Sequence, residues 1–119
     1  MILVDTSVWV DHLKNGNPQL ETVLHDGKVF CHPMIIGELA CGNLSQYDKI
    51  MALLQVLPQA ITVNHDEALV FIFNNKLSGK GIGYIDAHLL ASCRLSNLQL
   101  WTYDQKLEFI ANTLKIGYP

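Results

Sequence analysis

Four acidic residues stand at positions where a carboxylate could do chemistry: Asp5, Glu38, Asp86 and Asp104. Asp5 directly follows an apolar run that is typical of a buried strand, and Asp104 closely follows a second such run. Glu38 is the only charge in an apolar helical pattern, and Asp86 lies in the first turn of a predicted helix after a glycine-rich loop. Because ligands of open α/β sheets bind beyond the carboxyl ends of the strands, these acids could meet at one edge.

Carboxylates that gather in one place need a counter-charge. At ~4 Å and an effective dielectric near 20, each like-charged pair costs about 4 kcal/mol. A divalent cation removes this repulsion, and oxygen ligands without histidine partners suit Mg²⁺ or Mn²⁺. Such a site could polarise a phosphodiester and lower the pKa of a bound water. The acids therefore favour metal-dependent phosphodiester chemistry.

Each acid also has a simpler explanation. Asp5 and Asp104 could cap the helices that follow them, and Asp86 could serve only the helix dipole. Glu38 could be an exposed helical residue, although its apolar neighbours disfavour that interpretation. The combination of the four positions, rather than any one of them, supports a shared site.

The elements that would position these residues alternate along the chain. Apolar runs predict strands over 2–4 and 28–31, within 57–63, and over 98–102, and helical patterns separate them. Thr6 or Ser7 could cap the first helix, Ser45 the fourth, and Asn64 the next, where Glu67 completes a capping box. This alternation predicts an α/β fold in which helices flank a mainly parallel sheet of about four to five strands.

Length and composition describe one domain over residues 1–119 with an ordinary core. Hydrophobic residues make up 50% of the chain and charged residues 16%, which excludes disorder. The net charge of −3 argues against a general nucleic-acid coat protein but not against a nuclease. The three cysteines form no CxxC pair, and no apolar run approaches the ~18 residues of a membrane span. We expect a cytoplasmic protein with reduced thiols.

Four sequence blocks then connect the chain to a known family. They are VDTSVWVD at the N-terminus, IIGELACG around Glu38, GIGYIDAHLLASC around Asp86 and LWTYDQKL around Asp104. With these blocks, in this order and spacing, the chain resembles PIN-domain ribonucleases, and within them the VapC toxins of toxin–antitoxin pairs. The resemblance implies a PIN-like, Rossmann-like α/β/α sandwich and a Mg²⁺- or Mn²⁺-dependent endoribonuclease. It also implies a homodimer and a small cognate antitoxin.

Residue by residue, the resemblance makes the four acids the catalytic, metal-binding set. Asp5 and Asp86 would bind the metal directly or through water, and Glu38 and Asp104 would complete the cluster or order the attacking water. Three hydroxyl residues would hydrogen-bond a carboxylate or a bound water: Thr6, Ser7 and Thr102.

Contacts to RNA are expected from basic residues around the glycine loop and the last acid. The candidates are Lys76, Lys80, Arg94 and Lys106, each of which could equally be an ordinary solvated charge. Many relatives have arginine just before the last acid, whereas this chain has Tyr103. The tyrosine could stack on a base instead of contacting a phosphate.

The leading hypothesis is a toxin that hydrolyses RNA with a metal-activated water and forms no covalent enzyme intermediate. A PIN-like module that binds RNA or protein without catalysis is an alternative, and the intact acidic set counts against it. A DNA or flap nuclease of the same fold is another, but the chain has little room for a DNA-binding arch. Apolar surface around 47–54 and 65–77 supports a dimer and a groove for an antitoxin segment.

Overall fold

The central strand of the fold is the first element of the chain. The computed structural model describes residues 1–119, and its sheet has the order β2-β1-β3, with β1 (Ile2–Val4) between β2 (Val29–Phe30) and β3 (Gln99–Trp101). Both pairings are parallel, and Leu3 lies opposite Phe30 on one side and Leu100 on the other. All three residues of β1 are buried, as expected of a strand that is covered on both faces.

The predicted parallel sheet between helices is confirmed, but the strand count of four to five was too high. Residues 57–63 make only one bridge, between Cys31 and Gln59. The Cys31 N–H donates to the Pro58 carbonyl, and the Ala60 N–H donates to the Cys31 carbonyl. Pro58 has no N–H that could add a further hydrogen bond to this strand pairing. The Ile61 N–H donates to Ser96 Oγ instead of to a strand. A second single bridge, between Leu100 and Gly117, lies at the other edge.

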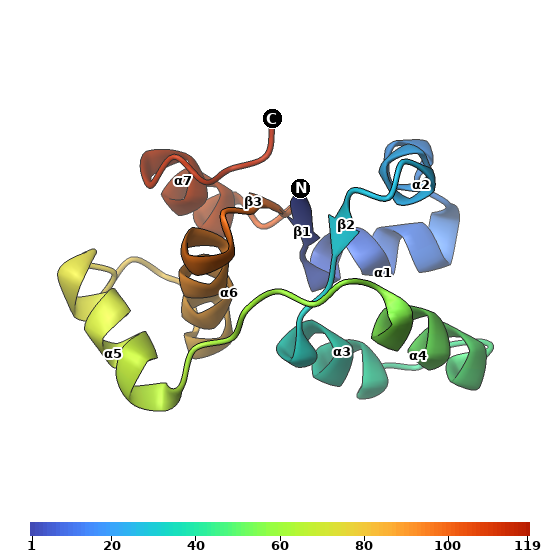
Figure 1. Ribbon diagram of the computed structural model, residues 1–119, viewed down its shortest axis with the longest axis horizontal. Helices are drawn as coiled ribbons and strands as arrows, with labels where there is room; N and C mark the ends of the chain where they lie inside the picture. The colour runs from blue at the N-terminus through green and yellow to red at the C-terminus, as the bar shows by residue number, and fades with distance from the viewer.

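Seven helices surround the three strands (Figure 1). In chain order they are α1 (Thr6–Asn15), α2 (Pro18–His25), α3 (Pro33–Ala40), α4 (Tyr47–Val56), α5 (His65–Asn74), α6 (Tyr84–Ser96) and α7 (Gln105–Thr113). Figure 1 shows α1 to α4 on one side of the sheet and α5 to α7 on the other. None of these helices has the length and apolar character needed to cross a membrane.

Local sequence signals explain most helix starts. The capping box at Asn64 and Glu67 is present with both of its hydrogen bonds, at 2.8 and 2.9 Å. Pro33 occupies the first turn of α3. A backbone N–H at this position would have no carbonyl partner within the helix, so proline sacrifices no hydrogen bond there. The predicted cap at Ser45 is wrong, because α4 begins after Gln46, which has a φ of 57° and makes no side-chain cap.

Both sides of the sheet are sealed by buried side chains. Leu3 and Val4 of the central strand are fully buried, as are Leu89 and Leu90 of α6 and Leu107 of α7. Trp9 is 1% exposed, and its helix α1 lies on the opposite side of the sheet in Figure 1. The core therefore fixes the helices that carry the four acids.

Candidate active site

Asp5 occupies the N-cap position of α1, but its carboxylate does not cap the helix. The Asp5 carbonyl accepts the N–H groups of Val8 and Trp9, and no cap hydrogen bond to the side chain forms. Asp5 Oδ2 instead accepts hydrogen bonds from Ser7 Oγ at 2.9 Å and Thr102 Oγ1 at 2.7 Å. The residue is only 6% exposed. The helix-cap explanation thus accounts for the Asp5 backbone and not for its buried carboxylate, and the predicted cap at Thr6 or Ser7 is wrong.

Two hydroxyl groups join the beginning of α1 to the end of β3. Ser7 Oγ and Thr102 Oγ1 lie 3.3 Å apart, although 95 residues separate them. The Tyr103 N–H donates to Ser7 Oγ at 3.0 Å, and the Asp104 N–H donates to Thr102 Oγ1 at 3.1 Å. Asp5 and Asp104 are therefore held in fixed positions by shared partners.

Asp104 caps α7, as the simpler explanation expected. Its Oδ1 atom accepts the Leu107 N–H at 3.0 Å. The carboxylate is exposed, and the cap uses one of its two oxygens. Capping and a role in the acidic cluster are therefore compatible.

Glu38 extends from α3 toward the first turn of α1. The residue is exposed, contrary to what its apolar neighbours suggested. Thr6 Oγ1 donates to Glu38 Oε1 at 2.7 Å, which ties the first turn of α1 to the middle of α3. Thr6 therefore orients Glu38, whereas Ser7 and Thr102 orient Asp5.

The pKa of Asp86 is affected by the other three acids. Burial raises the pKa of Asp86, the Gly83 N–H that donates to its Oδ2 at 3.1 Å lowers it, and the charges of the other acids raise it. These acids are Asp5, Asp104 and Glu38, in order of effect. The other three carboxylates predicted from the sequence therefore lie close enough to Asp86 to raise its pKa.

The donor chemistry of this site fits Mg²⁺ or Mn²⁺ better than a softer metal. All candidate ligands are carboxylate oxygens, the donors that hard cations prefer. As the side chains stand, no three Asp, Glu, His or Cys residues converge closely enough to hold an ion. Mg²⁺ keeps several waters and uses few protein ligands, so the residues fit an ion held partly through water.

The basic candidates fall into two groups. The alkyl chain of Lys106, in the first turn of α7, approaches Gly81 in the loop that also carries Lys80. This places Lys106 and the Lys80 loop beside the acids. Arg94 instead donates to the Leu114 carbonyl at 3.0 Å, near the C-terminal ends of α6 and α7. Lys76 is exposed after α5, with a φ of 54°.

Sequence reasoning missed Asn17. This buried residue donates from Nδ2 to Tyr103 Oη at 2.7 Å and to Asp11 Oδ2 at 3.1 Å, while its Oδ1 caps α2. The Asn17-Pro18 pair gave a local signal for the cap. Nothing local could indicate the contact with Tyr103, which is 86 residues away.

Comparisons with known proteins agree with this architecture. Ribonuclease VapC32 of Mycobacterium tuberculosis is 44% identical over 109 residues, which cover 91% of this chain and 88% of that protein. The solved structure of FitAcB from Neisseria gonorrhoeae aligns with a TM-score of 0.64 at 20% identity and covers 94% of each chain. PAE2754 from Pyrobaculum aerophilum aligns with a TM-score of 0.61 at 16% identity, over 95% of this chain and 85% of that one. These two structures support the fold.

The family assignment comes from the sequence. The PIN domain pattern matches residues 2–112, which is nearly the whole chain and includes all four acids. With this match and a relative at 44% identity, the chain belongs to the PIN-domain family and is similar to its VapC ribonucleases.

Proposed function

We propose that this protein is a Mg²⁺- or Mn²⁺-dependent endoribonuclease and the toxic component of a type II toxin–antitoxin pair. The observation that carries the proposal is the buried Asp5 carboxylate, which two hydroxyl groups orient among three further acids. The 44% identical relative named a ribonuclease supports RNA as the substrate. A cytoplasmic location follows from that substrate.

Each polar group has a separate task in this proposal. Asp5 and Asp86 would hold the divalent cation, which supplies a bound water of lowered pKa and stabilises the leaving oxygen. Ser7 and Thr102 keep the Asp5 carboxylate in one orientation. Glu38 and Asp104 complete the acidic set or order the attacking water, and Thr6 restrains Glu38. Hydrolysis would be direct, without a covalent enzyme intermediate.

Tyr103 is suited to contact a base beside the acids. Its ring is 50% exposed, and the Asn17 amide fixes its hydroxyl group. The Trp101 ring lies edge-on to it, with the centroids 6.1 Å apart. A restrained, half-exposed ring offers a stacking surface for an unpaired base at little entropic cost.

A groove between α1 and the α3–α4 region suits a segment of the proposed antitoxin. It has a volume of about 430 Å³ and apolar walls that include Val10, Leu13, Leu39 and Leu44. Glu38 lines the same groove, so a bound segment would reach the acidic set. We propose that the antitoxin inhibits the enzyme by occupying this groove.

The exposed face of α5 suits a second copy of the chain. Leu69, Val70 and Phe73 are 47%, 57% and 82% exposed, although α5 packs on α6 through its other face. Isolated apolar residues are common on surfaces, but three on one short helix form a patch. We propose that this face forms the homodimer interface.

Metal-dependent cleavage by purified protein tests the proposed function. RNA should be cut with Mg²⁺ or Mn²⁺, and EDTA should abolish cutting. Asp5→Asn should lower the cleavage rate at least about a hundredfold, because it removes charge from the cation site. Asp48→Asn is the matched control, since Asp48 is exposed on α4. Cleavage that survives EDTA or Asp5→Asn would contradict the proposal.

A PIN-like module that binds RNA without cutting it is the second candidate. It is favoured by the half-exposed Tyr103 ring, which could contact an RNA base without any cation. The same preparation distinguishes the two, because such a module would bind RNA and leave every RNA intact in Mn²⁺. Flap DNA, assayed in parallel, tests for a DNA nuclease of the same fold.

A further inference from the structure

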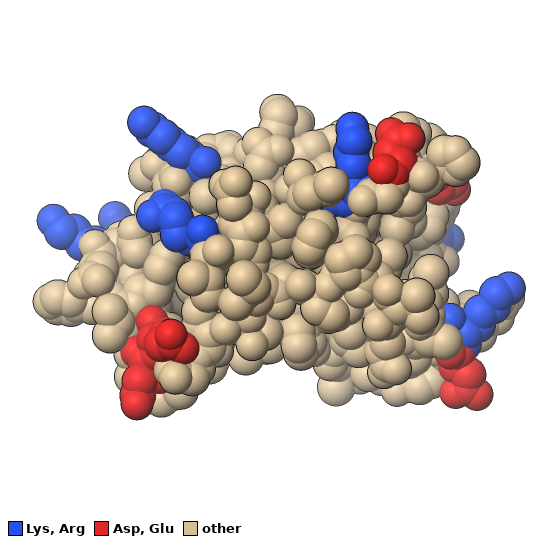
Figure 2. All heavy atoms as spheres, in the orientation of Figure 1, with Lys and Arg blue, Asp and Glu red and all other residues tan.

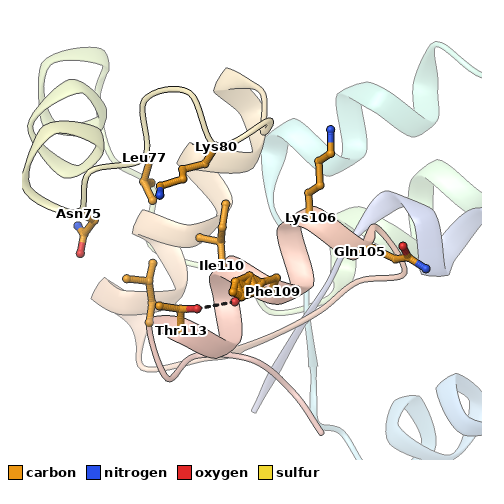
Figure 3. Close-up of a pocket in the computed structure, with 9 residues that line it drawn as sticks. Asn75, Leu77, Lys80, Gln105, Lys106, Phe109, Ile110 and Thr113 are labelled. Carbon is orange, nitrogen blue, oxygen red and sulfur yellow. Dashed lines mark hydrogen bonds between the residues drawn. The ribbon is translucent and has the colours of Figure 1, made fainter.

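A cavity of about 470 Å³ lies between α7 and the segment that joins α5 to α6 (Figure 3). Its lining is contributed by residues 75, 77 and 80 of that segment and by residues from 105 to 114 in and just after α7. The volume falls within the range of small-ligand sites, roughly 300–1,000 Å³. The proposed active site does not account for this cavity.

One end of the cavity adjoins the acidic set. Lys106 follows Asp104 by two residues, and Lys80 belongs to the loop that leads to Asp86. The two segments meet at Gly81, where an added Cβ would lie 2.9 Å from Lys106 Cδ. Gly81 also has a φ of +84°, which other residues rarely adopt. A polymer that crosses the acids could thus continue into the cavity past both lysines.

The interior of the cavity combines an aromatic ring with positive charge. The Phe109 side chain is 65% exposed, while Leu77 and Ile110, which line the same cavity, are 6% and 9% exposed. Figure 3 shows Lys80 and Lys106 on the same side of Phe109, with Lys80 extending toward Leu77 and Lys106 extending away from Phe109. No acidic residue lines the cavity, so its formal charge comes from the two lysines.

The other polar groups are already partly engaged. Thr113 Oγ1 donates to the Phe109 carbonyl at 2.9 Å, the dashed line in Figure 3. The Asn75 amide donates to the Phe71 carbonyl at 2.9 Å. Few fixed donors remain to read a particular base edge, so the cavity suits stacking and phosphate contacts better than base-specific recognition.

We propose that this cavity binds one nucleotide of single-stranded RNA, adjacent to the bond that is cut. The base would stack on Phe109, and the backbone phosphate would lie near the ammonium groups of Lys80 and Lys106. An aromatic platform beside basic side chains is the combination that binds single strands with little sequence preference. The inference rests on the proposed function, because it takes the acids as the place of cleavage.

The test measures affinity separately from cleavage. Binding of a fluorescein-labelled 12-nucleotide RNA is followed by anisotropy in EDTA, and an abasic strand of equal length serves as the second probe. The variants are Phe109→Ala, Phe109→Tyr, Lys80→Gln and Lys106→Gln. The matched controls are Val56→Ala, which removes an 82% exposed apolar side chain outside the cavity, and Lys49→Gln, both on α4. Thermal unfolding checks the fold of each variant.

The proposal predicts different effects for the ring and the charges. Phe109→Ala should weaken binding of the normal RNA about fivefold or more and leave the abasic strand unaffected, because stacking needs a base. Phe109→Tyr should retain affinity. Each lysine variant should weaken both probes and reduce the salt slope by about 0.7. The controls should bind like the unchanged protein.

Two results would overturn the nucleotide site. In the first, all cavity variants bind RNA normally while the unchanged protein binds and cuts it, so the proposed function survives alone. In the second, the lysine variants weaken binding but Phe109→Ala binds like the Val56→Ala control, which leaves a phosphate contact without a base site. If the unchanged protein neither binds nor cuts RNA, the proposed function itself fails.

Discussion

The backbone and the side chain of Asp5 have separate roles. Its carbonyl starts α1, while its carboxylate is buried and bound by two hydroxyl groups. A buried carboxylate without such partners would be strongly unfavourable. The hydroxyl of Thr102 is therefore as much a part of the site as the acid it binds.

Thr102→Val tests that role with a side chain of similar shape. The change removes one hydrogen bond to Asp5 and the acceptor for the Asp104 N–H. We expect Mn²⁺ affinity and cleavage to fall about 10- to 100-fold, and the free energy of unfolding to fall by about 1–3 kcal/mol. Calorimetric titration, a cleavage assay and denaturant unfolding measure these effects. Thr22→Val on α2, where the hydroxyl binds only the Pro18 carbonyl, should leave cleavage unchanged.

Asp86 should make the metal-free protein less stable as the pH rises. Burial and the neighbouring acids raise its pKa in the folded state, so the folded protein holds the proton more tightly than the unfolded chain. The stabilisation is present at pH values below the unfolded pKa and is lost as the pH rises through the folded pKa. Asp86→Asn should therefore raise the melting temperature in EDTA at pH 7 more than at pH 4. An equal change at both pH values would contradict this explanation.

The elements that bear the acids are fixed to each other by buried polar contacts. His32 caps α3 through Nδ1, which accepts the Met34 N–H at 3.1 Å, so Nε2 carries the proton and donates to Ser92 Oγ of α6 at 3.0 Å. Because α3 carries Glu38 and α6 carries Asp86, this contact helps to set the separation of two acids. His32 is 1% exposed.

The His32 contact predicts a loss of stability in mild acid. Burial, and then the charge of His88, lowers the pKa of His32 from 6.5 to about 4. Its contribution is fully present above pH 6.5, and it is lost as the pH falls toward 4, because the unfolded chain takes up the proton first. The expected slope is up to about 1.4 kcal/mol per pH unit. Urea unfolding at pH 7 and pH 5 measures it, and His32→Asn, which retains a cap acceptor, should show a smaller slope.

The sequence predicted elements well where local chemistry determines them. The capping box at Asn64, the proline start of α3 and the buried strand before Asp5 all depend on neighbouring residues. The apolar run at 57–63 was misjudged as a strand because its pairing depends on Cys31 and on the missing N–H of Pro58. A strand needs a partner, and apolar composition alone does not specify how far the partner extends.

At the site, the types of residue could be predicted from the sequence, but the contacts between their side chains could not. The positions of the four acids in the sequence, after strands and in helices, predict a shared edge of the sheet. The bonds from Thr102 to Asp5 and from Asn17 to Tyr103 join residues 97 and 86 positions apart. Arg94 was expected near RNA because it follows Asp86 on the same helix, but eight residues of helix carry it about 12 Å along the axis.

At the scale of the whole molecule, the acids lie between two hollows of different character. The groove beside α1 is lined by Glu38 and Lys14 together with apolar side chains, whereas the only charged residues that line the cavity beside α7 are two lysines. Figure 2 shows several Lys and Arg side chains over α7 and the neighbouring ends of α5 and α6 in Figure 1, with acidic side chains over the other end of α5. This division suits a protein partner on one side of the acids and RNA on the other.

The exposed apolar face of α5 predicts the oligomeric state of the protein. The unchanged protein should be a dimer at micromolar concentration, and Phe73→Glu should convert it to a monomer, because a charge would be buried in the interface. Light scattering measures both. Leu95→Glu is the control, since Leu95 is an exposed apolar residue at the end of α6. A monomeric unchanged protein, or a dimeric Phe73→Glu variant, would contradict the proposed interface.

The position of β1 between β2 and β3 also affects when the protein can become active during its synthesis. The ribosome makes the central strand and Asp5 first, but Thr102, Asp104 and the strand that aligns them come about a hundred residues later. A nascent chain therefore holds Asp5 and Ser7 without Thr102 and Asp104 until about a hundred further residues have been made. If the protein cuts RNA as proposed, this order would keep it inactive toward the message while those residues are being made.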